Sequence, residues 1–341
     1  MHRPTPLQCP DARPVDGSVH PDDAARALLD GQTLRVTDSY RTAADILDAL
    51  GERLQPPRDD APHPVRRRFH EQSRETAKRL VVPIVDQQLA LNGATNIGFL
   101  QELYDGEDRF LLPFVEVQEL HGAWDTYTLG VKLAVLGHEV HPFYGTYAPS
   151  RTTHLELFAT WLSGYDGRRT RAIDVGTGCG VLALMLAKTF EHVVATDTNP
   201  NAVESVRREL LRRPRPIEVV ETDLLEGVGP ADLIVFNPPW LYGPVESPLD
   251  GALFFTDGLF TRFFDQAATG LRPDGRVVLV FSNILSLVQP DVPHPIEAEL
   301  KGDRFVLVKK SQRKVKPSPG RKRTREKVEV WELRLASPDF P

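Results

Sequence analysis

The stretch that decides the fold of this chain is Arg171-Ala-Ile-Asp-Val-Gly-Thr-Gly-Cys-Gly-Val181. Its apolar start predicts a buried strand that ends in Asp174, and three glycines follow the strand: Gly176, Gly178 and Gly180. A helical apolar run, 182–190, begins directly after them. Such a turn leaves backbone N–H groups facing a crevice at a helix N-terminus, and no Cβ blocks a ligand. The stretch therefore predicts a nucleotide-type binding turn in an α/β fold.

Polar residues also follow the next three predicted strands along the chain. The predicted strand His192–Thr196 ends in Asp197, placed about twenty residues on to accept hydrogen bonds from ribose hydroxyls. A third strand, Ile217–Val220, leads to Asp223, whose carboxylate suits an adenine amino group. The fourth strand, Ala231–Phe236, runs into Asn-Pro-Pro-Trp at positions 237–240.

Together these segments resemble the class I S-adenosylmethionine-dependent methyltransferases. The Asn-Pro-Pro-Trp turn resembles the branch that methylates planar nitrogens, which includes the release-factor glutamine methyltransferases and the small-domain rRNA methyltransferases. An NAD site would favour G-x-G-x-x-G, whereas this turn reads G-T-G-C-G after Asp174. The resemblance implies a doubly wound, Rossmann-like sheet of seven strands and S-adenosyl-L-methionine as the cofactor.

The resemblance also implies a set of cofactor-binding residues. These are Asp174, Gly176, Thr177, Gly178, Gly180, Asp197, Thr198, Asp223, Leu224 and Asn237, with Tyr147 and Arg151 from the aromatic segment Tyr-Gly-Thr-Tyr-Ala-Pro-Ser-Arg at 144–151. Alternatives stay open at three places. Asp174 serves either the ammonium of the cofactor or the N–H groups of its own loop. Asp197 and Asp223 are either cofactor ligands or helix-capping and solvated carboxylates, and the aromatic residues before Arg151 either adjoin the cofactor or seal the sheet.

The predicted catalytic residues are Asn237, Pro238, Pro239 and Trp240. The lone pair of an amide or arylamine nitrogen is delocalised, so two acceptors that hold both N–H protons favour a nucleophilic geometry. Asn237 offers a side-chain carbonyl and Pro238 a backbone carbonyl, while Trp240 offers a flat apolar face. Release-factor enzymes usually carry Tyr where this chain has Trp240. The alternative is that Asn-Pro-Pro-Trp forms an ordinary turn after a strand.

The length of 341 residues suffices for two domains. We expect a disordered tail over 1–17, a mostly helical auxiliary domain over 18–122, and the methyltransferase domain over 123–341. Within the auxiliary domain the pattern predicts helices including 21–29, 41–54 and 65–80, the last continued by apolar 81–85, and a strand over 111–120; a further helix is expected over 126–136. The auxiliary domain is either a packing partner or a substrate-recognition element.

Composition excludes several classes of protein. The two cysteines, Cys9 and Cys179, cannot form a disulfide framework, which favours a cytoplasmic protein. We expect no signal peptide and no membrane span, because no apolar run approaches about 18 residues. His138 and His141 lack metal-ligand spacing, so no metal is expected.

Charge is unevenly distributed along the chain. Segment 309–327 holds ten Lys or Arg and one Glu, a net +9 in a chain of net −6, which leaves −15 elsewhere. We expect this segment to be the loop of a terminal hairpin that contacts a polyanion or is merely solvated. The predicted activity is N-methylation of a macromolecule, either a protein glutamine or an RNA or DNA base. A small-molecule methyltransferase and a non-catalytic binding module are the alternatives.

Overall fold

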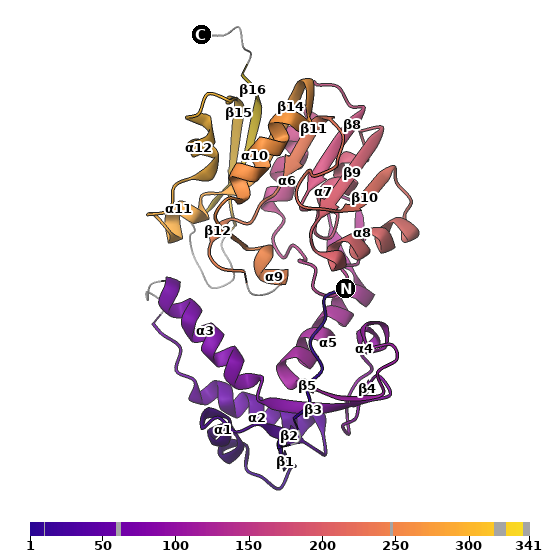
Figure 1. The fold of residues 1–341 in the computed structure, drawn as a ribbon, viewed down its shortest axis with the longest axis vertical. Helices are drawn as coiled ribbons and strands as arrows, with labels where there is room; N and C mark the ends of the chain where they lie inside the picture. Colours follow the sequence, from indigo (N-terminus) through magenta and orange to yellow (C-terminus); the bar gives the residue numbers. More distant parts are fainter. Residues whose placement is uncertain (10, 59–62, 246–247, 317–324, 337–341) are drawn as a thin grey trace. The chain divides into compact units, whose positions relative to one another are not determined.

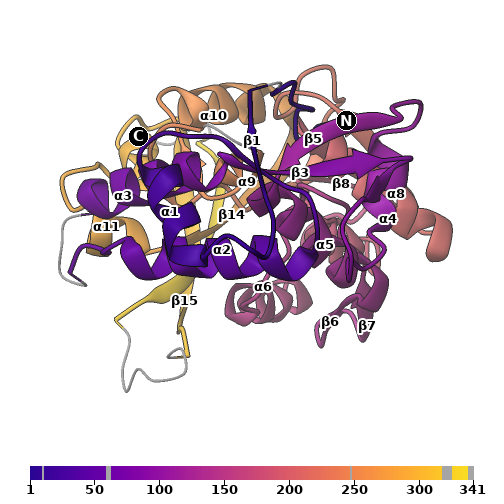
Figure 2. The ribbon, with the colours of Figure 1, turned by 90° about the horizontal axis from the view of Figure 1, so that it is seen from below.

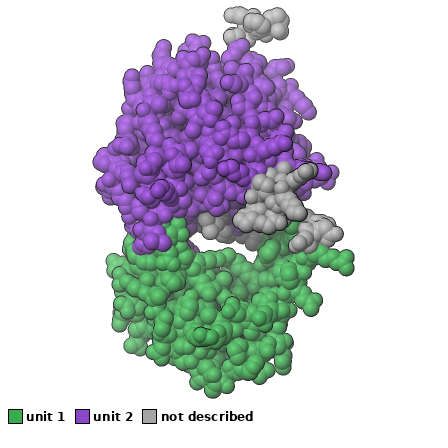
Figure 3. All heavy atoms as spheres, turned by 180° about the vertical axis from the view of Figure 1, so that it is seen from behind, with its two compact units in different colours: residues 1, 3–126 green, residues 2, 127–341 purple. Residues whose placement is uncertain are grey.

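The computed structural model describes residues 1–9, 11–58, 63–245, 248–316 and 325–336. The chain divides into two compact units, residues 1 and 3–126 and residues 2 and 127–341 (Figure 3). The break falls inside one long helix, four residues beyond the boundary expected from the sequence. Each unit has its own sheet.

The first unit is a set of helices on a five-stranded sheet. Strands β1, β2 and β3 are parallel, and β4 and β5 are antiparallel to β3. The elements are β1 (Arg13–Val15), α1 (Pro21–Leu29), β2 (Leu34–Val36), α2 (Tyr40–Arg53), α3 (His63–Ala77), β3 (Leu80–Val85), β4 (Gln88–Leu89), α4 (Gly98–Leu103), β5 (Arg109–Pro113) and α5 (Phe114–Leu129).

Three sequence expectations fail in this unit. The stretch 81–85, expected to continue a helix, is strand β3, because its apolar, β-branched residues pair with β2 and β5. The strand expected over 111–120 ends at Pro113, and helix α5 begins there with Phe114, Val117 and Leu120 buried at helical spacing. The tail expected to be disordered holds β1, whose pairing with β2 orders 13–15.

The second unit contains the seven-stranded sheet. Its order is β10-β9-β8-β11-β14-β16-β15, with the first five strands parallel and β16 antiparallel to both its neighbours (Figure 1). The strands are β8 (Arg171–Val175), β9 (His192–Asp197), β10 (Ile217–Glu221), β11 (Ala231–Phe236), β14 (Leu271–Ser282), β15 (Phe305–Lys314) and β16 (Lys327–Leu335). The predicted doubly wound, Rossmann-like sheet is confirmed.

Helices connect and cover these strands. They are α6 (Thr153–Ser163), α7 (Val181–Leu186), α8 (Pro200–Arg212), α9 (Pro248–Gly251), α10 (Leu259–Gly270), α11 (Ile284–Val288) and α12 (Pro295–Leu300). Two short pairs stand apart from the main sheet, β6 (Val131–Leu133) with β7 (His138–Val140) and β12 (Leu241–Tyr242) with β13 (Phe254–Phe255). The first pair is a hairpin where a helix over 126–136 was expected, since α5 ends at Leu129 before Gly130 at φ 75° (Figure 2).

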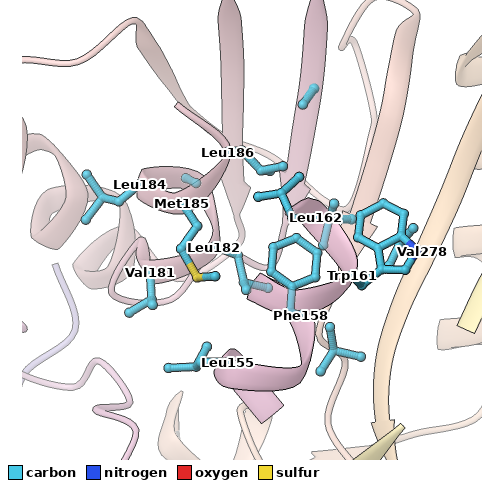
Figure 4. Packing of buried hydrophobic residues seen from close by; sticks show 14 of the residues in the cluster. Leu155, Phe158, Trp161, Leu162, Val181, Leu182, Leu184, Met185, Leu186 and Val278 are labelled. Carbon is cyan, nitrogen blue, oxygen red and sulfur yellow. The ribbon is translucent and has the colours of Figure 1, made fainter. Parts of the chain in front are cut away.

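Alternate residues of each central strand enter different hydrophobic clusters. In β11, Leu233 and Val235 belong to the cluster that α6 and α7 cover, which Figure 4 shows around Phe158 and Leu182. Ile234 and Phe236 belong to the cluster with α10 and α12. A parallel strand buried on both faces is largely apolar, and this explains the apolar run 233–236 of β11.

Candidate active site

Three neighbouring strands bring the predicted site residues to one edge of the sheet. In register, Val175 of β8 pairs with Thr196 of β9 on one side and with Phe236 of β11 on the other. One residue further along each strand stand Gly176, Asp197 and Asn237. The chain leaves β8 for β9 in one direction and reaches β11 in the other, so this edge is the switch point where open α/β sheets bind ligands.

The glycine loop has the left-handed backbone that its sequence predicts. Gly176, Gly178 and Gly180 have φ of 61°, 55° and 83°. A Cβ on Gly176 would lie 3.3 Å from the Phe236 ring, and one on Gly180 would lie 3.0 Å from Val206. A Cβ on Gly178 would meet nothing within 4 Å. The first and third glycines therefore serve packing as well as the turn, whereas the space beside Gly178 is open to a ligand.

Asp174 is buried and serves its own loop. Its Oδ2 accepts hydrogen bonds from the Thr177 hydroxyl at 2.7 Å and from the Ala183 backbone N–H at 2.9 Å. Burial raises the pKa of this carboxyl to about 7, against the lowering effect of those two donors. Of the two roles that the sequence left open, the structure favours the internal one, in which Asp174 and Thr177 hold the loop.

Asp197 connects β9 to the same loop. Its Oδ2 accepts the Gly178 N–H and its Oδ1 accepts the Asn199 N–H, both at 2.9 Å. Burial raises the pKa of this carboxyl, while these N–H groups and that of Thr198 oppose the shift. Each carboxylate oxygen accepts more than one hydrogen bond, so both remain acceptors for a diol. Open space beside Gly178 and a carboxylate next to it fit the adenosyl and ribose groups of S-adenosylmethionine.

Asp223 and Leu224 follow β10 at the outer side of the site. Asp223 forms an exposed ion pair with Arg262 of α10 at 3.3 Å. Leu224 is buried at φ 54°, and its carbonyl accepts the Thr196 hydroxyl at 2.7 Å. An adenine amino group would therefore share Asp223 with Arg262, a partner that the strand and loop pattern did not reveal.

The aromatic segment before α6 contacts the loop after β9 and the residue before β16. The Asn199 side chain donates to the Gly145 carbonyl at 2.9 Å, next to the Asn199 N–H that Asp197 accepts. Tyr147 is 39% exposed, and partial burial raises its pKa. Arg151 pairs at 3.0 Å with Glu326, at the start of β16. The structure thus joins Gly145 to Asp197 through Asn199 and directs Arg151 to the residue before β16.

The Asn-Pro-Pro-Trp turn differs from its expected form at Trp240. The indole is half-buried against both hydrophobic clusters, and its N–H donates to Asn237 Oδ1 at 3.2 Å and to the Val280 carbonyl at 3.3 Å. His154, in the first turn of α6, meets the Trp240 ring edge-on at 5.6 Å between centroids. An indole held in this way is anchored, which the expectation of a free stacking face did not include.

The sequence does not single out His154, because one histidine in a helix forms no motif with other residues. The residue is 6% exposed, and burial lowers its pKa to about 4, so its imidazole is neutral at physiological pH. Cys179, inside the glycine loop, is also buried, and its thiol pKa is raised to about 12. A thiol so protonated is no nucleophile at neutral pH.

Strand β16 of the terminal hairpin begins beside the carboxyl end of β14, at the site edge. Asn283, which follows β14, donates its backbone N–H to the Lys327 carbonyl at 3.1 Å and accepts the Lys327 N–H at 2.7 Å. Strand β15 extends into the segment 309–327 that was expected to be the hairpin loop, so four of its cations lie on the strand: Lys309, Lys310, Arg313 and Lys314. Positions 317–324, with Arg321, Lys322 and Arg323, lie outside the described residues.

Two features are absent from the part of the chain that the structure describes. No helix there has the length and apolar character of a membrane span. No group of three or more His, Cys, Asp or Glu side chains there is arranged to hold a metal ion.

Comparison with known proteins agrees with this geometry. Residues 156–292 match the methyltransferase small domain family. A release factor glutamine methyltransferase of Deinococcus radiodurans is 42% identical over 76 residues, 21% of this chain and 27% of that protein. Ribosomal RNA small subunit methyltransferase C of Alcanivorax borkumensis is 29% identical over 191 residues, 55% of this chain and 53% of that protein.

A third relative, a ribosomal protein L11 methyltransferase of Clostridium perfringens, is 39% identical over 79 residues, 22% of this chain and 25% of that protein. This chain thus spans between a quarter and about half of the length of these relatives. The family match, the names of these relatives as methyltransferases and the sheet order confirm the resemblance drawn from the glycine loop and the Asn-Pro-Pro-Trp turn. Over residues 156–292 this chain matches the methyltransferase small domain family, and it is similar to the release factor glutamine and ribosomal RNA small subunit methyltransferases.

Proposed function

We propose that this protein is an S-adenosylmethionine-dependent methyltransferase that acts on a planar nitrogen, an amide or an exocyclic amine, of a protein or nucleic acid. One observation supports this most: Gly176 and Asn237 directly follow the paired residues Val175 and Phe236 of neighbouring parallel strands. A cofactor turn and an amide acceptor are thereby held by the sheet itself. Rigid placement of this kind supplies most of what a methyl transfer requires.

The cofactor side would be formed by the loop after β8 and by Asp197. When bound, S-adenosylmethionine supplies a methyl group on an activated sulfonium. Gly178 leaves room for the ligand, and Asp197 would accept hydrogen bonds from its ribose. Tyr147 and Thr198, both exposed, are the proposed outer contacts of the cofactor. Asp223 and Leu224 would lie against the adenine.

The acceptor side would be formed by the Asn-Pro-Pro-Trp turn. Asn237 Oδ1 and the Pro238 carbonyl would accept the two N–H protons of the target nitrogen, and these bonds would strengthen as positive charge develops on it. Pro238 has no backbone N–H to compete, and with Pro239 it stiffens the turn. The turn thus orients the nitrogen lone pair without a strong base.

A macromolecular acceptor is favoured over a small molecule by the terminal hairpin. The relatives are named for methylating a release factor, a ribosomal RNA and a ribosomal protein. Strand β15 ends and strand β16 begins at the site edge, and segment 309–327 carries ten cations. We propose that it contacts a polyanionic partner and that residues 18–122 add to substrate recognition in the cytoplasm. A small-molecule acceptor is the alternative; a non-catalytic role is less favoured, because the loop glycines, Asp197 and Asn237 are all present.

The test is transfer of labelled methyl groups from S-adenosylmethionine into a fractionated lysate, with nuclease and protease treatment to identify the labelled class. We expect label in a macromolecule. Asn237→Ala should lower the rate about a hundredfold, because the acceptor acts mainly in the transition state, and it should leave cofactor affinity unchanged. Label confined to small molecules would favour the alternative. Wild-type turnover in Asn237→Ala would make the turn structural.

A further inference from the structure

Trp240 is tied to the proposed acceptor residue by its indole N–H. This single donor is shared between Asn237 Oδ1 at 3.2 Å and the Val280 carbonyl at 3.3 Å. Val280 belongs to β14, whose residue Leu279 pairs with Phe236 at the end of β11. The indole therefore bridges the turn to the next strand. Because a carboxamide without partners rotates about its own bond, such a donor determines which way Oδ1 faces.

His154 holds the other side of the same indole. Its ring stands at 90° to the Trp240 ring, with 5.6 Å between the centroids. It is 6% exposed and belongs to α6, a helix that packs against β14, β15 and β16. An edge-to-face pair of this kind fixes the plane of the indole.

We propose that Trp240 and His154 are positioning residues for Asn237: His154 sets the plane of the indole, and the indole N–H directs Asn237 Oδ1 toward the acceptor nitrogen. The inference rests on the proposed role of Asn237. It assigns Trp240 a task that a phenyl or phenol ring at position 240 cannot perform, since neither has a donor at the place of Nε1. The second lone pair of Oδ1 remains for the substrate N–H.

A double-mutant cycle separates this role from a merely structural one. Trp240→Phe keeps an aromatic ring and removes the donor, and it should lower kcat about tenfold with the KM for S-adenosylmethionine unchanged. In the Asn237→Ala background the same substitution should have no further effect, because Trp240 acts through Asn237. Additive losses would instead show that Trp240 acts on the substrate by itself, and would overturn the proposal.

Trp331 provides the matched control. It is 3% exposed in β16, and its indole N–H donates to Glu329 Oε2 at 3.0 Å. Trp331→Phe should therefore cost similar stability but leave kcat near the wild-type value. His154→Ala should reproduce the kcat loss of Trp240→Phe, and His154→Phe, which keeps a flat ring, should restore most of it. Equal losses of kcat in Trp331→Phe and Trp240→Phe would show that the effect of Trp240→Phe comes from general packing.

A measurement that needs no methyl acceptor tests the positioning role independently of the proposed function. In ¹⁵N-labelled protein the Asn237 carboxamide resonances are assigned by their absence in Asn237→Ala. We expect them to shift in Trp240→Phe and to stay in place in Trp331→Phe. Unchanged resonances in Trp240→Phe would overturn the positioning role even in an active enzyme. A shift without any methyl transfer in the wild type would contradict only the proposed function.

Discussion

The backbone N–H of Gly178 donates to Asp197 Oδ2 at 2.9 Å, so the glycine loop after β8 and the carboxylate after β9 form one connected structure. Gly178 has φ 55°, and the bond points its N–H toward the neighbouring strand end. The shape of the cofactor turn therefore depends on Asp197 as well as on the glycines. A substitution at either residue should change both the turn and the affinity for the cofactor.

Gly178→Ala should abolish most S-adenosylmethionine binding at a small cost in stability. The new Cβ would meet no protein atom within 4 Å, so it would occupy the space proposed for the ligand. Gly137→Ala is the control, since Gly137 has φ 82° and a Cβ added there would also meet nothing within 4 Å. Both variants should lose about 1 kcal/mol of unfolding free energy from the left-handed backbone. Calorimetry that finds equal cofactor affinity in the two variants would refute the placement.

Asp197→Ala should weaken S-adenosylmethionine binding by about 1–3 kcal/mol, through lost charge-assisted bonds to the ribose and a loosened Gly178. Asp197→Asn separates the two effects, because its side-chain oxygen still accepts one backbone N–H but carries no charge. We expect intermediate affinity for it in titration calorimetry. Affinity equal to that of the wild type in Asp197→Ala would remove this residue from the cofactor site.

The pH dependence of stability should carry the signature of His154. Its pKa of about 4 in the folded state lies below the ordinary 6.5, so between these values the unfolded chain binds the proton more readily. Acidification through this window therefore lowers the free energy of unfolding. The contribution of neutral His154 to that free energy is fully present above about pH 6.5 and is lost as the pH falls toward 4. The pKa difference corresponds to about 3 kcal/mol.

Asp174 acts in the opposite direction, because its folded pKa of about 7 exceeds the ordinary 3.8 and acidification favours its folded, protonated form. The two groups are separated by comparing denaturant unfolding of the wild type and His154→Phe from about pH 4.5 to 7, the window in which both titrate. We expect the variant to lose less stability on acidification. Parallel curves for the two proteins would show that His154 titrates normally.

The basic hairpin should make partner binding sensitive to salt. Neutralising Arg321, Lys322, Arg323 and Arg325 should lower the salt dependence of RNA affinity by up to about 0.7 to 0.9 per lost phosphate contact, with cofactor binding unchanged. Neutralising four exposed cations elsewhere on the same unit, Lys132, Arg207, Arg212 and Arg215, is the control. Equal salt slopes in both variants, or methylation of the lysate target at the wild-type rate in the hairpin variant at low and moderate salt, would make the hairpin a solvated surface.

Local pattern was sufficient for the methyltransferase sheet. The strands at 171–175 and 231–236 are short, mostly apolar segments followed by glycine or Asn-Pro-Pro, and these signals do not depend on distant residues. The strand at 81–85 was different: its apolar residues suit a buried helix equally well, and only pairing with β5, more than twenty residues away, makes it a strand. The same holds for 13–15, which only β2 orders.

From the sequence it follows that a glycine turn, Asp197 and Asn237 gather at one sheet edge, because the carboxyl ends of parallel strands must meet there. Tertiary structure alone decided how each side chain is used. Asp174 is directed into its own loop by Thr177 and Ala183, Asp223 is paired with Arg262, and Trp240 is drawn to Asn237 and Val280. The positions of the strands follow from local pattern, whereas these contacts depend on how each side chain is oriented in the folded chain. Those of Asp223 with Arg262 and of Trp240 with Val280 also join residues 39 and 40 positions apart, which no spacing in the sequence specifies.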